Sequence, residues 1–173
     1  MQLTGKEIIE QGIITNYCEE GIQQQGIDVR IDSIKRVSTH RQYGVIPKNQ
    51  KTTTPDYIEV SRLDTWNNVS STSTWLLEPG YYEVTLMEGC SIPSNATLHF
   101  KTRSSLVRCG SLIHSGQFDA GFKTDAMGCF LQVLMPISIE RGARIAQAIC
   151  FNSNEVENLY DGQWQGDKQR NPK

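Results

Sequence analysis

The sequence has no excess of basic charge and no long hydrophobic run. Its formal net charge is −2 over 173 residues. A protein that grips a nucleic-acid backbone usually carries a basic surplus, so this balance argues against duplex binding but not against a small anion in a local basic pocket. No apolar stretch approaches the roughly 20 residues that a membrane-spanning helix needs, and residues 1–6 are too polar for a signal peptide. We therefore expect a cytoplasmic protein, or one in the host cytoplasm if it is viral, with no nucleic-acid or membrane partner.

Cysteine and histidine are also too sparse and too scattered for a disulfide framework or a metal site. The five cysteines are odd in number, and none belongs to a Cys-x-x-Cys pair. This usage is typical of a reduced, intracellular chain in which thiols serve as small apolar side chains. The three histidines add no spacing typical of a zinc site. The sequence therefore predicts no metal held by protein ligands.

Short strands separated by turn signals make up most of what is present. Thr4 and Glu7 form a capping-box pattern that predicts one short N-terminal helix, which Gly12 should end. Residues 26–32 alternate apolar and charged side chains with period 2, which predicts a strand. Because turn signals recur every 8–12 residues, we expect a single all-β domain over residues 1–173, a barrel or double-sheet jelly roll.

Four further segments of this reading are specific enough to be tested. Residues 38–56 are polar and contain two prolines, which predicts a long loop or a protruding hairpin. Residues 67–74 are rich in Ser, Thr and Asn, which predicts a loop. Residues 97–102 should form a strand, and residues 128–135 should form a strand that is buried on both faces.

Two adjacent stretches, residues 101–110 and 114–122, concentrate polar chemistry. Two arginines and two hydroxyl side chains fall within six residues of the first stretch: Arg103, Ser104, Ser105 and Arg108. Arginine forks and hydroxyls suit the oxyanions of a polyphosphate. In the second stretch Asp119 lies in a glycine-flanked turn near Phe122, and such a carboxylate can activate an attacking water. The alternative is an ordinary polar strand surface followed by a hairpin turn.

Five motifs, in order along the chain, resemble those of the dUTPase and dCTP deaminase superfamily, and the chain looks like its deaminase-like branch of trimeric dUTPases. Residues 26–30 resemble the first motif, and Arg103–Arg108 is similar to the deaminase-type second motif, the most specific match. Residues 118–122 resemble the third motif and residues 142–147 the fourth. Residues 160–166 are similar to the mobile C-terminal motif.

The resemblance implies a distorted jelly roll of the dUTPase-like β-clip kind, assembled as a homotrimer with active sites shared between subunits. It also implies a deoxynucleoside triphosphate substrate that carries Mg²⁺ on its phosphates. The ion then binds through phosphates and waters, so no cluster of carboxylates is needed.

The chemistry at the base separates hydrolysis from deamination. By resemblance, a deaminase needs a glutamate on the strand after the third motif, but residues 128–135 contain none. The polar side chain nearest to that role is Gln132, which cannot exchange a proton near neutral pH. We therefore expect hydrolysis of dUTP to dUMP and diphosphate, with Gln132 as a substrate contact.

The resemblance also assigns roles to individual residues. Asp119 orients and activates the water as the catalytic residue. Phe122 packs against the deoxyribose and disfavours a 2′-hydroxyl. The remaining candidates are substrate contacts: Arg103, Ser104, Ser105, Arg108 and Gln147 on the phosphates, together with Asp28 and the tail residues Tyr160, Gln163 and Lys168.

The C-terminal tail, about residues 153–173, departs from ordinary dUTPases because it lacks their Gly-rich, Ser/Thr-containing phosphate clamp. We expect it to be mobile and to order over the active site, with Lys168 in place of the clamp. Three alternatives stay open because the base is not identified by the sequence: a dCTP deaminase with one or two activities, a dCTP-directed diphosphatase, and a non-catalytic nucleotide-binding protein.

Overall fold

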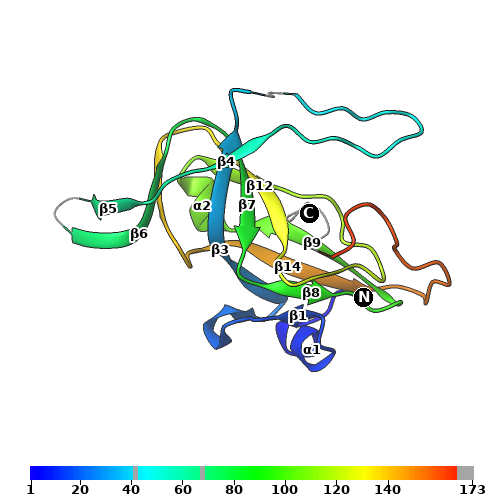
Figure 1. The fold of residues 1–173 in the computed structure, drawn as a ribbon. Helices are drawn as coiled ribbons and strands as arrows, with labels where there is room; N and C mark the ends of the chain where they lie inside the picture. The colour runs from blue at the N-terminus through cyan, green and yellow to red at the C-terminus, as the bar shows by residue number, and fades with distance from the viewer. Residues whose placement is uncertain (41–42, 67–68, 167–173) are drawn as a thin grey trace.

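Antiparallel strands dominate the computed structural model, which describes residues 1–40, 43–66 and 69–166. Two short helices, α1 (Gly5–Glu10) and α2 (Ser104–Arg108), and the 3-10 turn η1 (Glu19–Gly21) accompany the strands in this part of the chain (Figure 1). The strands are β1 (Ile14–Thr15), β2 (Ile22–Gln23), β3 (Gly26–Val37), β4 (Tyr57–Glu59), β5 (Leu63–Trp66), β6 (Val69–Leu77), β7 (Gly80–Leu86), β8 (Gly89–Ser91), β9 (Ala96–Thr102), β10 (Ser111–His114), β11 (Lys123–Thr124), β12 (Gly128–Val133), β13 (Ile137–Glu140) and β14 (Arg144–Asn152).

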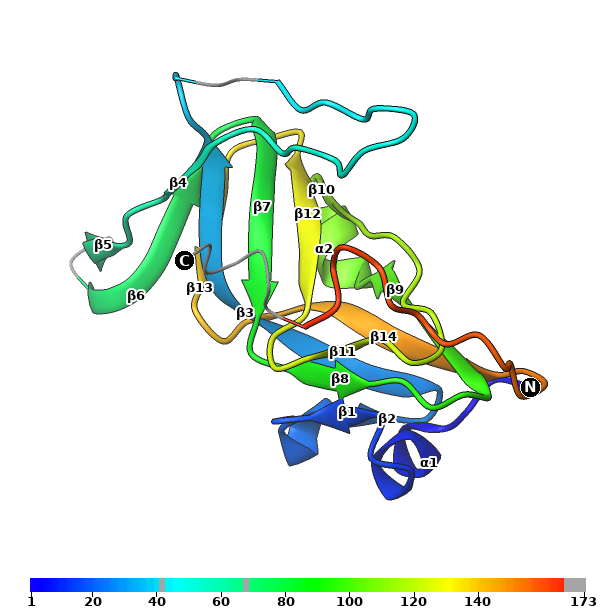
Figure 2. The ribbon, with the colours of Figure 1, turned by 45° about the vertical axis from the view of Figure 1, so that its right-hand side comes forward.

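The long strand β3 connects the two halves of the main sheet. The strand order is β10-β12-β7-β3-β14-β9, and β2 and β4 also pair with β3. The first half of β3 pairs with β14 and the second half with β7, with a register shift between Ile31 and Ser33. Figure 2 shows β7, β12 and the upper part of β3 standing across β14. The sheet therefore curves into a nearly closed, barrel-like layer, which the three-stranded sheets β1-β8-β11 and β13-β6-β5 extend.

The core fills the inside of this curved sheet. Ile27, Ile31 and Ile34 of β3, Leu131 of β12 and Ile145 of β14 are each at most 2% exposed. Burying an aliphatic side chain contributes about 1.5–3 kcal/mol, so the inward faces of these strands supply most of the stabilisation. The all-β, barrel-like fold is confirmed.

Helix α1 begins and ends where the sequence predicts. The Glu7 amide donates to Thr4 Oγ1 at 3.3 Å, and the Thr4 amide donates to Glu7 Oε2 at 2.8 Å. This reciprocal pair satisfies two amides that have no partner inside the helix. Gly12 follows the C-cap residue with φ +65°, a conformation that glycine adopts without strain.

Three local predictions are wrong. Helix α2 follows β9, so the N-terminal helix is not alone; β9 loses its partner after the Ala146–Thr102 pair, and the chain then closes its own hydrogen bonds. Residues 69–74 belong to β6 instead of a loop, because the threonines in this stretch also favour strands. Strand β12 is buried on one face only, since Phe130 on its other face is 38% exposed.

The predicted protrusion is a hairpin over residues 43–56, which we call the projecting hairpin. Its two arms are joined by reciprocal backbone hydrogen bonds between Val45 and Thr53, at 2.8 and 2.9 Å. In Figure 2 it extends from the end of β3 toward the side of the molecule where the C-terminal segment lies. No helix in the described ranges is both long enough and apolar enough to cross a membrane.

Candidate active site

The buried carboxylate of Asp28 organises the first cluster of candidate residues. Asp28 is 3% exposed and lies at the start of β3. Its Oδ2 is 3.1 Å from Nε of Arg103 and 3.5 Å from Nη1 of Arg144. Burial raises the pKa of Asp28, while the charges of Arg103 and Arg144 act in the opposite direction. Asp28 therefore forms ion pairs with Arg103 and Arg144.

Strand register explains why residues far apart in sequence meet here. Gln147 of β14 is the Cα partner of Asp28 on β3 and of Lys101 on β9. Paired residues point to the same face of a sheet. Gln147, Asp28 and Lys101 form a mostly polar cavity with residues from β2, from the end of β9 and from the start of α2. We call this cavity the arginine site. Its lining residues are Gln23, Asp28, Lys101, Thr102, Arg103, Ser104 and Gln147.

The Arg103 side chain is held in one orientation. Its Nη1 donates to the backbone oxygen of Arg144 at 3.0 Å while Nε faces Asp28. Ser104, exposed at the start of α2, lies beside it. Ser105 and Arg108 do not line the arginine site: Ser105 lines a different cavity beside β13, and Arg108 is exposed at the end of α2.

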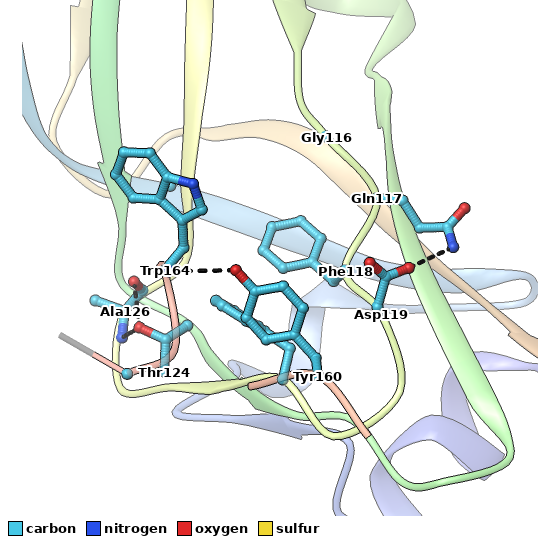
Figure 3. Close-up of a pocket in the computed structure, with 11 residues that line it drawn as sticks. Gly116, Gln117, Phe118, Asp119, Thr124, Ala126, Tyr160 and Trp164 are labelled. Atoms are coloured by element: carbon cyan, nitrogen blue, oxygen red, sulfur yellow. Dashed lines mark hydrogen bonds between the residues drawn. The ribbon is translucent and has the colours of Figure 1, made fainter. Parts of the chain in front are cut away.

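The second cluster lies in the loop after β10 and under the C-terminal segment (Figure 3). We call it the aromatic pocket. Its lining residues are Gly116, Gln117, Phe118, Asp119, Phe122, Thr124, Ala126, Gly128, Tyr160, Trp164 and Gly166. The Phe118 and Phe122 rings are 5.5 Å apart, and the Phe122 and Tyr160 rings are also 5.5 Å apart, both in edge-on packing. Edge-on packing of this kind stabilises the wall of the pocket.

Asp119 is exposed at the mouth of the aromatic pocket, on a turn that is fixed on both sides. Before it, Phe118 exchanges two backbone hydrogen bonds with Leu98, both 3.0 Å. After it, the Phe122 amide donates to the Asp119 carbonyl at 3.0 Å. Nε2 of Gln117 donates to Asp119 Oδ1 at 2.7 Å, which leaves Oδ2 available to a water.

The C-terminal segment covers one side of this pocket. The Tyr160 amide donates to the Ala120 carbonyl at 2.8 Å. Gly121 has φ +87°, and a Cβ there would lie 2.6 Å from Cβ of Leu159. The glycine of the Asp-Ala-Gly turn is therefore required twice, once for its backbone conformation and once for the approach of the tail.

The other tail candidates have different surroundings. Gln163 forms two hydrogen bonds with the backbone of Thr52 in the projecting hairpin. Lys168 lies outside the described residues. Gln132 lines neither cluster; its Oε1 is 2.9 Å from Nε2 of His114 on the neighbouring strand.

The structure therefore separates the candidates into two groups. Asp28, Arg103, Ser104 and Gln147 meet in the arginine site, and Asp119, Phe122 and Tyr160 meet in the aromatic pocket. Among the residues that the structure describes, none lines both cavities. Nowhere in the described ranges do three or more Asp, Glu, His or Cys side chains come close enough to form a cation-binding cluster.

Sequence reasoning missed several residues that line the two cavities or contact the candidate residues in them. Arg144 is the second partner of Asp28, and its place in the fourth motif was the available signal. Gln117 contacts Asp119 from two positions earlier in the chain. Thr124 and Ala126, from a segment that looks like an insertion after the third motif, line the aromatic pocket, and no sequence pattern marks them.

Comparisons with known proteins identify the family to which the chain is similar. A model of the dCTP deaminase-like family matches residues 3–153. A deoxyuridine 5'-triphosphate nucleotidohydrolase of Methanocaldococcus jannaschii is 33% identical over 152 residues, which cover 87% of this chain and 91% of that protein. A probable deoxyuridine 5'-triphosphate nucleotidohydrolase of Halobacterium salinarum is 32% identical over 151 residues, 87% of each chain. The fold is similar to a crystal structure of 2'-deoxycytidine 5'-triphosphate deaminase from Agrobacterium tumefaciens, with a TM-score of 0.58 and 18% identity over 86% of this chain and 47% of that one.

Proposed function

This chain belongs to the dCTP deaminase-like family, and we propose that it is a dUTP diphosphatase, cleaving dUTP to dUMP and diphosphate. Curated relatives at 32–33% identity over 87% of the chain carry the name deoxyuridine 5'-triphosphate nucleotidohydrolase. The structural observation that supports the proposal is Asp119, exposed on a fixed turn beside an aromatic wall. Such a carboxylate can act on a water next to a bound nucleotide.

In the proposed reaction, Asp119 orients a water and accepts its proton as the water oxygen attacks the α-phosphorus. The bond from the α-phosphorus to the bridging oxygen breaks, and diphosphate leaves. The charge that develops on the phosphate oxygens is stabilised by fixed donors, which in this chain are Arg103, Ser104 and Gln147. Phe122 and Tyr160 enclose the nucleoside end.

We propose that each active site is completed by two protomers of a homotrimer. The support is the separation of the two clusters within one chain, because the arginine site and the aromatic pocket share no lining residue. If the aromatic pocket of one protomer faces the arginine site of the next, Asp119 and the phosphate donors surround one triphosphate. A single chain then has both parts of the machinery but no complete site.

The proposed substrate is the magnesium complex of dUTP. Mg²⁺ prefers to keep several waters and to bind through phosphates and one or two carboxylates. The arginine site suits such a substrate, since its donors are a lysine, an arginine, two hydroxyls and two amides, and its carboxylate is already paired with Arg103 and Arg144. Phosphate oxygens are thus bound by the protein and shared with the metal that the substrate brings.

Deamination of dCTP is the second candidate, because the matching family model is dCTP deaminase-like. No glutamate lines the aromatic pocket among the described residues. Gln132 is bonded to His114 and lies outside this pocket. A side-chain amide does not exchange protons near neutral pH, so Gln132 is no proton shuttle for the cytosine ring. The carboxylate that lines the described pocket is that of Asp119, to which the proposed hydrolysis assigns the attacking water.

A product assay separates these functions. The protein is incubated with Mg²⁺ and dUTP or each of the four standard dNTPs, and nucleotides, diphosphate and ammonia are measured. We expect dUMP and diphosphate from dUTP, and a loss of about 10³-fold in Asp119→Asn, since general base catalysis contributes about 10²–10⁴-fold. Asp125→Asn, which changes an exposed aspartate that does not line the pocket, is the matched control. Ammonia from dCTP with dUTP untouched would establish a deaminase instead, and unchanged bound dUTP would indicate a non-catalytic binding protein.

A further inference from the structure

The projecting hairpin is hydrogen-bonded to the C-terminal segment through Thr52. Most of the hairpin is exposed, but Thr52 is half-buried. Its amide donates to Oε1 of Gln163 at 2.9 Å, and its carbonyl accepts from Nε2 of Gln163 at 2.7 Å. The next residue, Thr53, forms backbone hydrogen bonds with Val45 on the other arm of the hairpin. The backbone to which Gln163 binds is therefore fixed by the hairpin itself.

A second glutamine, Gln165, uses both ends of its carboxamide to bind backbone groups next to the aromatic pocket. The Lys123 amide donates to Oε1 of Gln165 at 2.9 Å, and Nε2 of Gln165 donates to the Gly121 carbonyl at 2.9 Å. Trp164 lies between the two glutamines and lines the pocket. In Figure 3 its indole stands beside the Tyr160 ring, and its amide donates to the Tyr160 hydroxyl at 3.2 Å.

We propose that the projecting hairpin is a positioning arm for the C-terminal segment. Gln163 binds Thr52 with both ends of its carboxamide, and these hydrogen bonds, together with those of Gln165, set Trp164 at the aromatic pocket. We therefore assign Gln163 to positioning, because its amide nitrogen and its oxygen are both bonded to the backbone of Thr52 and hold the side chain against the projecting hairpin. The effect on catalysis rests on the proposed function, whereas the docking of the segment does not.

The structure also shows how the arm can be removed without disturbing the sheet. Val37 of β3 pairs with Tyr57 of β4, and the Ser38 amide donates to the Asp56 carbonyl at 2.6 Å. Replacing residues 39–55 by Asn-Gly should close β3 and β4 with a two-residue turn. Thr52→Pro is a milder alternative, since it keeps the length of the hairpin and removes only the amide that donates to Gln163.

Backbone hydrogen exchange of the free protein tests the arm without any turnover. In the wild type, the amides of Tyr160 and Gly166 should be protected, because both donate to backbone carbonyls. Gln163→Ala, Thr52→Pro and the shortened hairpin should each increase exchange in residues 160–166 by about tenfold, as expected for losing one or two hydrogen bonds. Gln50→Ala, at an exposed position in the same hairpin, should change nothing.

Combining the changes separates a specific contact from a general loss of stability. Adding Gln163→Ala to the shortened hairpin should give no further increase in exchange, because the two groups act through one contact. With dUTP, each single variant should raise KM by about three- to tenfold and change kcat less, if docking mainly limits binding. Additive effects, or wild-type exchange in Gln163→Ala, would overturn the proposal. A wild type that protects the segment but does not cleave dUTP would overturn the proposed function alone.

Discussion

The arginine site and the aromatic pocket are built in different ways. Paired strands build the first: Gln147 is aligned with Asp28 and with Lys101 by the registers of β14 with β3 and of β14 with β9. A loop and a tail build the second, and side-chain amides such as that of Gln165 hold them together. Sheet hydrogen bonds fix every residue of a strand at once, whereas an amide fixes one point. The arginine site, the proposed phosphate end, is therefore formed by the sheet, and the aromatic pocket, the proposed nucleoside end, depends on a few separate contacts.

Removing an arginine from the strand-built side should have the largest effect in this comparison. Arg103→Ala should lower kcat/KM for dUTP by about 100-fold, because loss of one fixed donor to a developing oxyanion costs about 10²–10³ in rate. Steady-state diphosphate release measures this effect. Arg141→Ala is the matched control, since Arg141 bonds to Asp32 at the surface and should contribute little. Equal losses in both variants would contradict the assignment.

Adding a methyl group at Gly121, beside the aromatic pocket, should have an intermediate effect on activity. In Gly121→Ala the new Cβ meets Leu159 at 2.6 Å, so the tail must move away from the turn that carries Asp119. We expect KM for dUTP to rise by about tenfold, together with about 1–2 kcal/mol of strain from a non-glycine residue at positive φ. Gly12→Ala has a similar φ of +65° and no atom within 4 Å, so it reproduces the strain without the clash. If both variants raise KM equally, the tail contact is not the cause.

The smallest expected effect is on the pH dependence of stability, and it comes from the buried carboxylate of Asp28 in the arginine site. Burial raises the pKa of Asp28 in the folded protein above its value in the unfolded chain. The stability that this group contributes is therefore fully present below the unfolded pKa, near 4, and is lost as pH rises through the folded pKa. In denaturant titrations from pH 4 to pH 7, the unfolding free energy of the wild type should fall relative to that of Asp28→Asn. If the unfolding free energy of the wild type instead rises with pH relative to that of Asp28→Asn, the attraction of the two arginines for the Asp28 carboxylate outweighs the effect of burial on its pKa.

Sequence reasoning succeeded where the pattern that marks an element is local. The capping box at Thr4 and Glu7, the alternation after Gly26 and the glycine-flanked turn around Asp119 can all be read from neighbouring residues, although distant strands also hold the last two in place. The motif resemblance then indicated which polar side chains belong to the site, and part of that set meets in the structure.

The failures concern contacts between distant segments. Nothing near Gln163 in the sequence indicates that its partner is Thr52, 111 residues away. Helix α2 begins where the chain turns away from β14 after Thr102, although β14 itself continues to Arg144, and nothing in residues 104–108 indicates that turn. Arg144 became visible as a partner of Asp28 only when β3 and β14 were aligned.

Mixing two inactive variants tests most directly whether one active site is shared by two protomers. Arg103→Ala protein, which keeps Asp119, is co-refolded in equal amounts with Asp119→Asn protein, which keeps Arg103, and mixed trimers are verified by native mass spectrometry. If the arginine site of one protomer serves the aromatic pocket of another, about a quarter of the sites regain both intact halves, and dUTP cleavage returns to about a quarter of the wild-type rate. Verified mixed trimers with no more activity than either variant alone would contradict the account.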